Sequence, residues 1–414
     1  MKKRFGLLLI LALAFLLVQC SDRTVEPEPV NDSPVRTPDN LNAAEQELAG
    51  SFNRFGLKLF REIVDQEPGD INLFLSPVSV SMALGMTCNG ARGQTRDEMQ
   101  TTLEIAGLTP EEMNHAYHSL IQLLVTLDDD VKLTIANSIW SRTGLPVKDE
   151  FIELNRTYFD ALVRTLDFSD STAADTINAW VYENTGGKIE KIISGPISPD
   201  VVMHLINAIY FKAAWTIPFN PDSTLDAGFN LPDGSTTACR MMNKEGYFHI
   251  RLTPDFYAVD LPYGDSSFSM LVILPHQEIG IDSVVRQMTE ENWIAWTDPF
   301  VIHNIPLSLP RFKVEYEIQL KPILESMGMP LSFTPAADFT GMVEGGGLWI
   351  DAVKHKTYVE INEEGTEAAA VTDVIMVTSM PPPFVADRPF LFVIYERVNK
   401  TILFMGRIVK PSTD

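Results

Sequence analysis

Few residues in this sequence have the types and spacing that catalysis or metal binding requires. His115 and His118 can lie one turn apart on a helix, where two imidazoles could bind a metal ion. No third ligand lies near them in the sequence, so a solvated helix face is the favoured interpretation. The run from Gly345 to Gly347 is not followed by a helix pattern, which favours a loop over a phosphate-binding turn. The G-x-S-x-G, G-x-G-x-x-G, P-loop and H-E-x-x-H motifs are absent, so we expect no catalytic residue, metal or cofactor.

The segment from Thr366 to Met380 is unusual for a different reason: its fifteen residues include no glycine, proline or basic side chain. In an extended strand, Glu367 and Asp373 would lie on one face, and the other face would carry no charge. A sheet could accept such a strand between two others, because no charge would have to be buried. The prolines that begin at Pro381 cannot donate ladder hydrogen bonds and would end the strand. An edge strand or a disordered loop is the simpler interpretation of composition alone.

Composition is that of a large globular chain with a substantial core: 414 residues, 45% hydrophobic. The formal net charge of −23 argues against nucleic acid as a partner, because phosphate binding needs clustered lysine and arginine. No break in composition divides residues 41–414, which we interpret as a single domain. Cys88 and Cys239 are interpreted as two buried free thiols, since spacing alone does not predict a disulfide.

The first forty residues are interpreted as export and tethering segments. Residues 1–19 combine a basic start with a short apolar stretch, which predicts a signal peptide. Cys20 ends a sequence similar to a bacterial lipobox and is the candidate for lipidation, although Gln19 stands where a small residue is usual. Residues 21–40 are rich in Pro, Asp and Ser and predict a disordered tether. The alternative is ordinary secretion with a disordered N-terminus.

Patterning predicts an α+β chain, with helices first and many strands later. Apolar spacing predicts a helix over Ala43–Gln66, and Ser76 before Pro77 predicts the N-cap of a buried helix. Capping-box spacing at Thr95 and at Thr109 predicts two more helix starts. Strands are expected over the following ranges, with a C-terminal hairpin around Asn399: Val131–Trp140, Val201–Phe211, Phe268–Pro275 and Leu348–Asn362.

Four segments in order resemble the serpin family, and the resemblance extends from about Leu41 to Pro411. They are NLFLSPVSVSMALGMTCNGARGQTRDEM, INAIYFKAAW, VEINEEGTEAAAVT and DRPFLFVIYERVNKTILFMGRIVKP. The resemblance implies a serpin fold with three β-sheets, eight or nine helices and an exposed reactive loop. It also implies a five-stranded sheet that can accept the loop as a sixth strand.

The resemblance implies a protease inhibitor of the suicide-substrate type rather than an enzyme. In inhibitory serpins a protease cuts the reactive loop, remains bound as an acyl-enzyme, and is carried along as the loop inserts into the sheet. The implied partners are serine endopeptidases, with cysteine endopeptidases as a second class. A non-inhibitory serpin that binds or stores a ligand is the alternative. The chain is expected to be a monomer on the outer membrane or cell surface, otherwise periplasmic or secreted.

The resemblance assigns roles to residues in three regions. The hinge of the reactive loop corresponds to Gly365, Thr366, Glu367, Ala368, Ala369 and Ala370. The shutter and breach of the central sheet correspond to Ser76, Ser79, Asn207, His355 and Trp215.

The reactive bond is predicted to be Thr378-Ser379. Counting back from the prolines gives this bond, whereas counting forward from Glu363 gives Ser379-Met380, and Val377 remains a further alternative. No lysine or arginine is near, and small or β-branched residues suit elastase-like or subtilisin-like proteases. Residues 366–378 would span about 40 Å as an extended strand.

Overall fold

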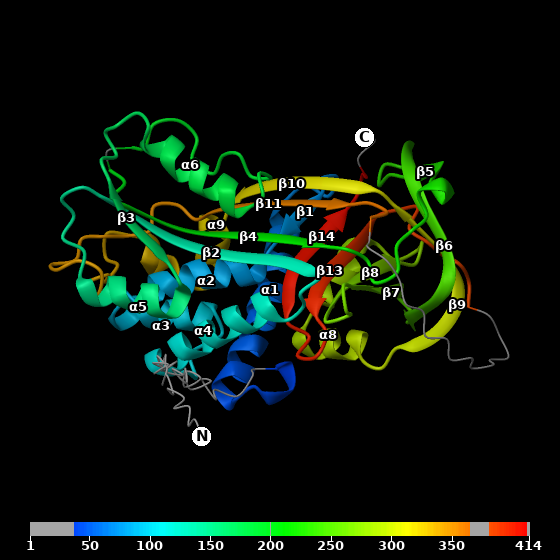
Figure 1. Ribbon diagram of the computed structural model, residues 1–414, viewed down its shortest axis with the longest axis horizontal. Helices are drawn as coiled ribbons and strands as arrows, with labels where there is room; N and C mark the ends of the chain where they lie inside the picture. The colour runs from blue at the N-terminus through cyan, green and yellow to red at the C-terminus, as the bar shows by residue number, and fades with distance from the viewer. Residues whose placement is uncertain (1–36, 199, 365–380, 412–414) are drawn as a thin grey trace, which may run out of the picture. The chain divides into compact units, whose positions relative to one another are not determined.

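The computed structural model describes residues 37–198, 200–364 and 381–411 (Figure 1). The α+β class and the expected three sheets and eight or nine helices are confirmed, because these residues form nine α-helices and three hydrogen-bonded sheets. Helices predominate before residue 130 and strands after it. In the described part of the chain, no helix is both long enough and apolar enough to cross a membrane.

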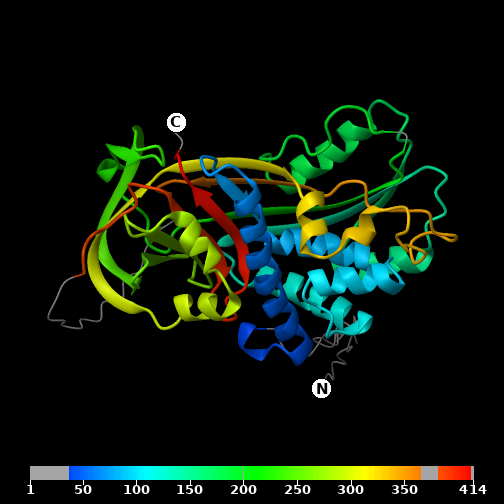
Figure 2. The same ribbon diagram turned by 180° about the vertical axis from the view of Figure 1, so that it is seen from behind.

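The N-terminal helices form where their caps and apolar spacing predict. α1 (Ala43–Gln66) is capped by Asn42, whose side chain accepts from the backbone N–H of Glu45 at 3.0 Å. α2 (Pro77–Cys88) begins after Ser76 and is buried on nearly all sides, so it can serve as a central support. α4 (Pro110–Thr126) has the predicted capping box at Thr109. Figure 2 shows α1, in blue, beside the red C-terminal strand β14 (Ile402–Ile408), which it contacts.

The predicted helix start at Thr95 is wrong. α3 runs from Gly93 to Thr102, so Thr95 lies inside its first turn. Its hydroxyl oxygen accepts from the backbone N–H of Asp338 at 2.9 Å instead of capping the helix. The remaining helices are α5 (Asp149–Phe159), α6 (Ala173–Asn184), α7 (Ile281–Arg286), α8 (Glu290–Thr297) and α9 (Lys321–Met327).

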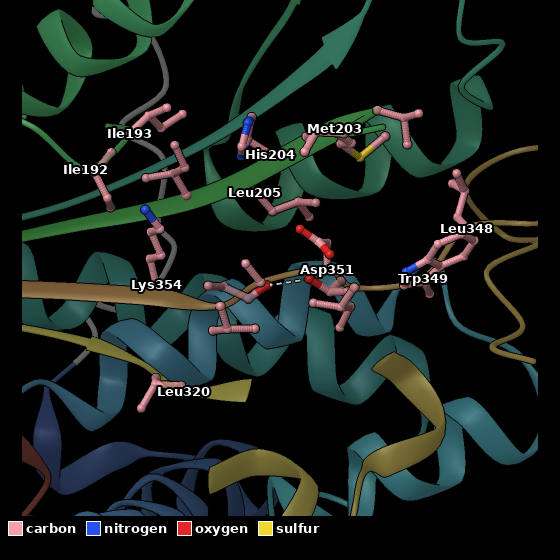
Figure 3. A pocket seen from close by; sticks show the side chains of 18 of the residues that line it. Ile192, Ile193, Met203, His204, Leu205, Leu320, Leu348, Trp349, Asp351 and Lys354 are labelled. Carbon is pink, nitrogen blue, oxygen red and sulfur yellow. Dashed lines mark hydrogen bonds between the residues drawn. The ribbon is translucent and has the colours of Figure 1, made fainter. Parts of the chain in front are cut away.

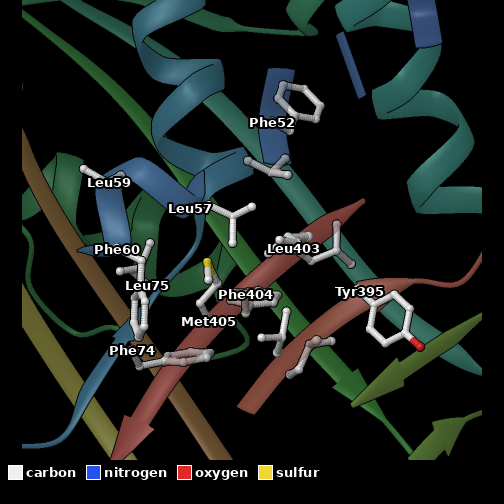
Figure 4. Close-up of a cluster of buried hydrophobic side chains, with 14 of the residues drawn as sticks. Phe52, Leu57, Leu59, Phe60, Phe74, Leu75, Tyr395, Leu403, Phe404 and Met405 are labelled. Atoms are coloured by element: carbon white, nitrogen blue, oxygen red, sulfur yellow. The ribbon is translucent and has the colours of Figure 1, made fainter. Parts of the chain in front are cut away.

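The largest sheet has nine strands and contains the C-terminal hairpin, β13 and β14, between β1 and β8. Phe74 on β1 stacks between Phe392 and Phe404, with ring centroids 5.6 and 5.2 Å apart (Figure 4). The hairpin is therefore core rather than surface. The strands are β1 (Leu73–Leu75), β5 (Leu225–Asn230), β6 (Thr236–Leu252), β7 (Phe256–Tyr263), β8 (Phe268–Pro275), β9 (Val301–Pro310), β12 (Phe384–Val385), β13 (Phe390–Glu396) and β14.

The other five strands form two separate hydrogen-bonded groups. One has the order β3-β2-β4, made of Leu162–Leu166, Val131–Arg142 and Met203–Ala213. The second pairs β10 (Phe312–Gln319) with β11 (Lys354–Ile361). The resemblance implies one sheet of five strands, whereas these five described strands form two groups with no hydrogen bond between β4 and β11. The predicted strand over Leu348–Asn362 is shorter in the structure, where β11 begins at Lys354, because residues 348–353 have no strand partner.

Helices cover the group that contains β4. α2 packs against β4, and α6 packs against β2 and β4 through a second apolar cluster. In that cluster the rings of Trp140 and Trp180 meet edge to face with centroids 6.2 Å apart. Cys88 and Cys239 are free and buried, and burial raises the pKa of the Cys88 thiol to about 12. Both thiols are therefore protonated at neutral pH.

Candidate functional site

The facing edges of β4 and β11 border a gap that we call the slot, and a cavity of about 440 Å³ lies at the end of the slot where both strands begin (Figure 3). β4 pairs with β2 on one side, and β11 pairs with β10. No backbone hydrogen bond joins β4 to β11 among the described residues. His204 and Leu205 line the slot from β4, Lys354 and His355 line it from β11, and α2 lies beneath it.

The two strands that border the slot run parallel. Trp215, just after β4, donates its Nε1–H to the carbonyl of Asn362, just after β11, at 2.9 Å. At the opposite end of the slot, His204 and Lys354 both line the cavity near the starts of the two strands. The chain leaves β11 at the Trp215 end. A segment that returned from there into the slot would run antiparallel to both strands and could pair with both.

Three of the residues assigned to the shutter form one buried cluster at the base of the slot. Ser76 donates its backbone N–H to His355 Nε2 at 3.0 Å and its hydroxyl to the carbonyl of Leu403 at 2.8 Å. The backbone N–H of Ser79 donates to Ser76 Oγ at 3.2 Å. Burial lowers the pKa of His355 to about 4, so its ring is neutral and can accept. This cluster joins α2 to β11 and β14.

Asn207, also assigned to the shutter, lies outside that cluster. Its Nδ2–H donates to Asn137 Oδ1 at 2.8 Å and contacts Met82 Sδ at 3.9 Å. Its Oδ1 is buried without a hydrogen-bond partner in the described part of the chain. His204 Nε2 is unpaired in the same way. Buried polar atoms are nearly always bonded, so a segment that entered the slot could supply partners to these two atoms on its β4 side.

The Trp215 end of the slot is held by stacking and by an ion pair. The rings of Trp215 and Tyr263 stack with centroids 4.4 Å apart. Glu363, buried just after β11, accepts from Arg311 Nε at 2.6 Å and from the hydroxyl of Thr224. Burial alone would raise the pKa of Glu363, but these bonds outweigh it and the pKa is lowered. The carboxylate is therefore ionised and fixes the point where the chain leaves β11.

Sequence reasoning missed His204 and Arg311. Arg311 could have been noticed, because it is a single cation between two strand patterns in an acidic chain. No sequence signal distinguishes His204, whose role depends on which strand edge remains open. His115 and His118 both lie on α4, the first exposed and the second partly buried. No group of three potential ligands is close enough to hold a metal ion in the described residues.

The predicted hinge residues Gly365 to Ala370, the candidate reactive residues Val377 to Met380, and Cys20 lie outside the described residues. The structure does describe both flanks of the loop. β11 ends at Ile361, and the chain is described again from Pro381, just before β12. β12 pairs in parallel with β9, with Phe384 opposite Leu307. The two ends of the loop therefore attach to different sheets.

Comparison with known proteins agrees with this architecture. The family described as "Serpin (serine protease inhibitor)" matches residues 51–411. This chain belongs to the serpin family. Human neuroserpin is 33% identical over 83% of the chain and 87% of its own length. Bovine leukocyte elastase inhibitor is 34% identical over 88% of the chain and 100% of its length.

Solved serpin structures share the fold over most of the chain. Human thyroxine-binding globulin, solved in complex with its ligand, superposes with a TM-score of 0.80 at 30% identity, covering 90% of this chain and 100% of that one. The thermophilic serpin Tengpin, in its native state, superposes with a TM-score of 0.78 at 30% identity, covering 90% and 95%. Serpins are in general protease inhibitors rather than enzymes, but the family also contains binding proteins. The geometry of the slot is therefore the evidence that bears on whether this chain is an inhibitor or a binding protein.

The buried histidines of this serpin predict a loss of stability in acid. Burial lowers the pKa of both His204 and His355 to about 4, whereas an unfolded histidine titrates near 6.5. Between these values the unfolded chain binds protons that the folded chain does not, so the free energy of unfolding falls as the pH falls. His204→Phe should recover about 3 kcal/mol of that loss between pH 6.5 and 4.

Urea unfolding at several pH values measures this effect. Ile294→Phe, at an exposed position on α8, is the control, and because it removes no titratable group it should leave the pH dependence unchanged. An identical pH dependence in the His204 variant and the parent protein would show that His204 does not titrate in this way.

Proposed function

We propose that this serpin irreversibly inhibits serine endopeptidases by inserting its cut reactive loop into the slot between β4 and β11. The observation that carries the proposal is the pair of parallel, unpaired strand edges beside a cavity of about 440 Å³. The loop follows β11 directly, so it is the nearest segment that could enter. Its predicted uncharged face, which begins at Thr366, suits burial against α2.

The proposed reaction begins as ordinary proteolysis. The serine of the protease attacks the carbonyl carbon of Thr378, an ester forms, and the peptide bond to Ser379 breaks. The new amino group of Ser379 takes the proton that the catalytic histidine of the protease had accepted. Insertion then moves the ester over about 40 Å, and distortion of the protease prevents its hydrolysis. Cleavage one residue later, at Ser379-Met380, is the alternative.

The proposed targets are elastase-like or subtilisin-like proteases. Val377 and Thr378 are small or β-branched, and no basic residue that would suit a trypsin-like pocket is near. The similarity to bovine leukocyte elastase inhibitor supports this class. Cysteine endopeptidases are a second target class, since they form an acyl-enzyme through a thiolate in the same position of the reaction.

A second candidate function is binding of a small molecule, as the name of thyroxine-binding globulin states for that relative. The volume of the cavity at the end of the slot favours it, because small-molecule pockets commonly measure about 300 to 1,000 Å³. The unpaired strand edges favour insertion instead, because a small ligand would leave most of their backbone groups without partners.

We further propose that the chain is an exported monomeric lipoprotein, held at the outer membrane or cell surface by lipid on Cys20 and by a tether over residues 21–40. Periplasmic or secreted forms are the alternative. A tether of this composition would leave the serpin domain free to meet proteases.

Incubation of the mature chain with neutrophil elastase should give an equimolar complex that survives denaturing electrophoresis, because an ester links the two proteins. Mass spectrometry of the released C-terminal peptide should show Ser379 at its start, or Met380 for the alternative bond. Cleavage by elastase, subtilisin and papain without any covalent complex would contradict inhibition and favour the binding role.

Substitutions of adjacent hinge residues test which face of the loop is buried. Thr366→Arg would place a charge on the inserting face, so insertion should slow and most molecules should be cleaved as substrate. Glu367→Arg, on the opposite face, is the matched control and should inhibit with nearly the parental stoichiometry. Equal stoichiometry in both variants would refute the assignment of faces.

Replacement of Cys20 tests the lipid anchor. In the native host, Cys20→Ser should move the protein from the membrane fraction to the soluble fraction, because no lipid could be attached. Labelling with a fatty-acid analogue should mark the parent protein and not the variant. Cys239→Ser is the matched control and should remain in the membrane fraction. A soluble, unlabelled parent protein would support ordinary secretion.

A further inference from the structure

A second cavity, of about 250 Å³, lies among the four helices α2, α3, α4 and α5, and we call it the helical pocket. Cys88 and Asn89 line it from the end of α2, Arg96 lines it from α3, and Met113 and Leu154 line it from α4 and α5. Among the described residues, none that lines the helical pocket also lines the cavity at the end of the slot. The two cavities are therefore separate sites.

Two neighbouring arginines line the helical pocket with part of each guanidinium group unbonded. Both side chains are partly buried. Arg92 Nη1 donates to the carbonyls of Asn89 and Ala91, at 3.0 and 2.8 Å. Arg96 Nε donates to the same Ala91 carbonyl at 3.1 Å. The other N–H groups of both side chains have no acceptor in the part of the chain that the structure describes. A guanidinium has five N–H donors in a planar fork, so both arginines can still bind oxygen atoms.

The positive charge of these two arginines is not cancelled inside the helical pocket. Asp338 is near both, but its Oδ1 accepts from the backbone N–H and hydroxyl of Thr340, and it forms no ion pair with either arginine among the described residues. Cys88 carries no charge, because burial raises the pKa of its thiol to about 12. Glu111 and Glu150 also line the pocket, but both are exposed, and solvent screens their charges.

The rest of the lining is apolar or already hydrogen-bonded. The side-chain amides of Asn89 and Asn114 donate to one another at 2.9 and 3.0 Å, so they need no ligand. Met113 is buried, and Leu154 and Tyr158 are partly buried beside it. The helical pocket thus combines free cationic donors with an apolar wall. An occupant that matches both features has an anionic group and an apolar body.

We infer that the helical pocket binds a small organic monoanion, namely a carboxylate with an apolar or aromatic body. Its carboxylate accepts from the free N–H groups of Arg92 and Arg96, because a guanidinium fork fits the two oxygens of a carboxylate. Its body packs against Met113, Leu154 and Tyr158. The two glutamates at the rim repel anions of higher charge, which favours a monoanion over inorganic phosphate. The inference does not rest on the proposed inhibitory function.

The test measures binding to the full mature chain by titration calorimetry with naphthalene-2-carboxylate, benzoate and octanoate. The neutral 2-naphthamide is the matched ligand and should bind at least tenfold more weakly than naphthalene-2-carboxylate. Arg96→Gln should weaken binding of the carboxylate about tenfold, because one charge-assisted hydrogen bond is lost. Arg164→Gln, at an exposed position on β3, is the matched control and should keep the parental affinity.

A second variant tests the location without removing a charge. Leu154→Trp adds volume inside the helical pocket and should abolish binding, while the unfolding temperature without ligand stays near that of the parent protein. Parental affinity in this variant would overturn the site. It also keeps the inference testable if Arg96→Gln does not fold.

The other outcomes separate this site from the slot and from the inhibitory function. Loss of binding in Lys354→Gln, and not in Arg96→Gln, would assign the anion to the cavity at the end of the slot and overturn the inference. Equal affinity for the carboxylate and the amide would show that the arginines do not hold the anion. Absence of binding for all three carboxylates at millimolar concentration would also overturn it. None of these results changes whether the parent protein forms a covalent complex with a protease.

Discussion

The open edges of β4 and β11 are the constraint on which the rest of the structure depends. Every backbone N–H and C=O group in a protein interior needs a partner, and a strand edge presents a row of such groups. Here two parallel edges face one another across a slot, with α2 beneath them. A single strand running antiparallel to both could satisfy both rows. The fold therefore holds a sheet that lacks its middle strand.

Such an arrangement needs support that does not come from the missing strand. α2 supplies it from below, because Ser76 connects the helix to His355 on β11 and to Leu403 on β14. The aromatic stack of Phe74, Phe392 and Phe404 holds β1, β13 and β14 of the nine-stranded sheet together. These contacts do not cross the slot between the strand edges. A strand could enter without breaking them, so the core and the opening are mechanically separate.

Local patterns predicted the local structure, and contacts between distant residues account for what was missed. Cap residues and apolar spacing gave α1 and the start of α4, and a short apolar, β-branched run gave β8 with its bounds. Thr95 failed as a cap because its hydroxyl is engaged by Asp338, which is remote in sequence. In the candidate site, the resemblance assigned Ser76, Ser79 and His355 to one region, and the structure places them in one hydrogen-bonded cluster. It could not show that Asn207 pairs elsewhere, or that His204 lines an open slot, since both depend on how far the strands stand apart.

The two ends of the slot are held differently, and this difference sets the order in which a strand could enter. At one end Arg311 anchors Glu363, so the chain that follows β11 turns about a fixed point. The hydrogen bond from Trp215 to Asn362 also closes this end, and a neutral bond of this kind contributes only about 1 kcal/mol. At the far end, His204 Nε2 has no hydrogen-bond partner among the described residues, so this side chain forms no bond across the slot. Insertion that begins at Trp215 satisfies backbone groups step by step as it advances, whereas insertion from the His204 end would first require the whole loop to cross the slot without a partner.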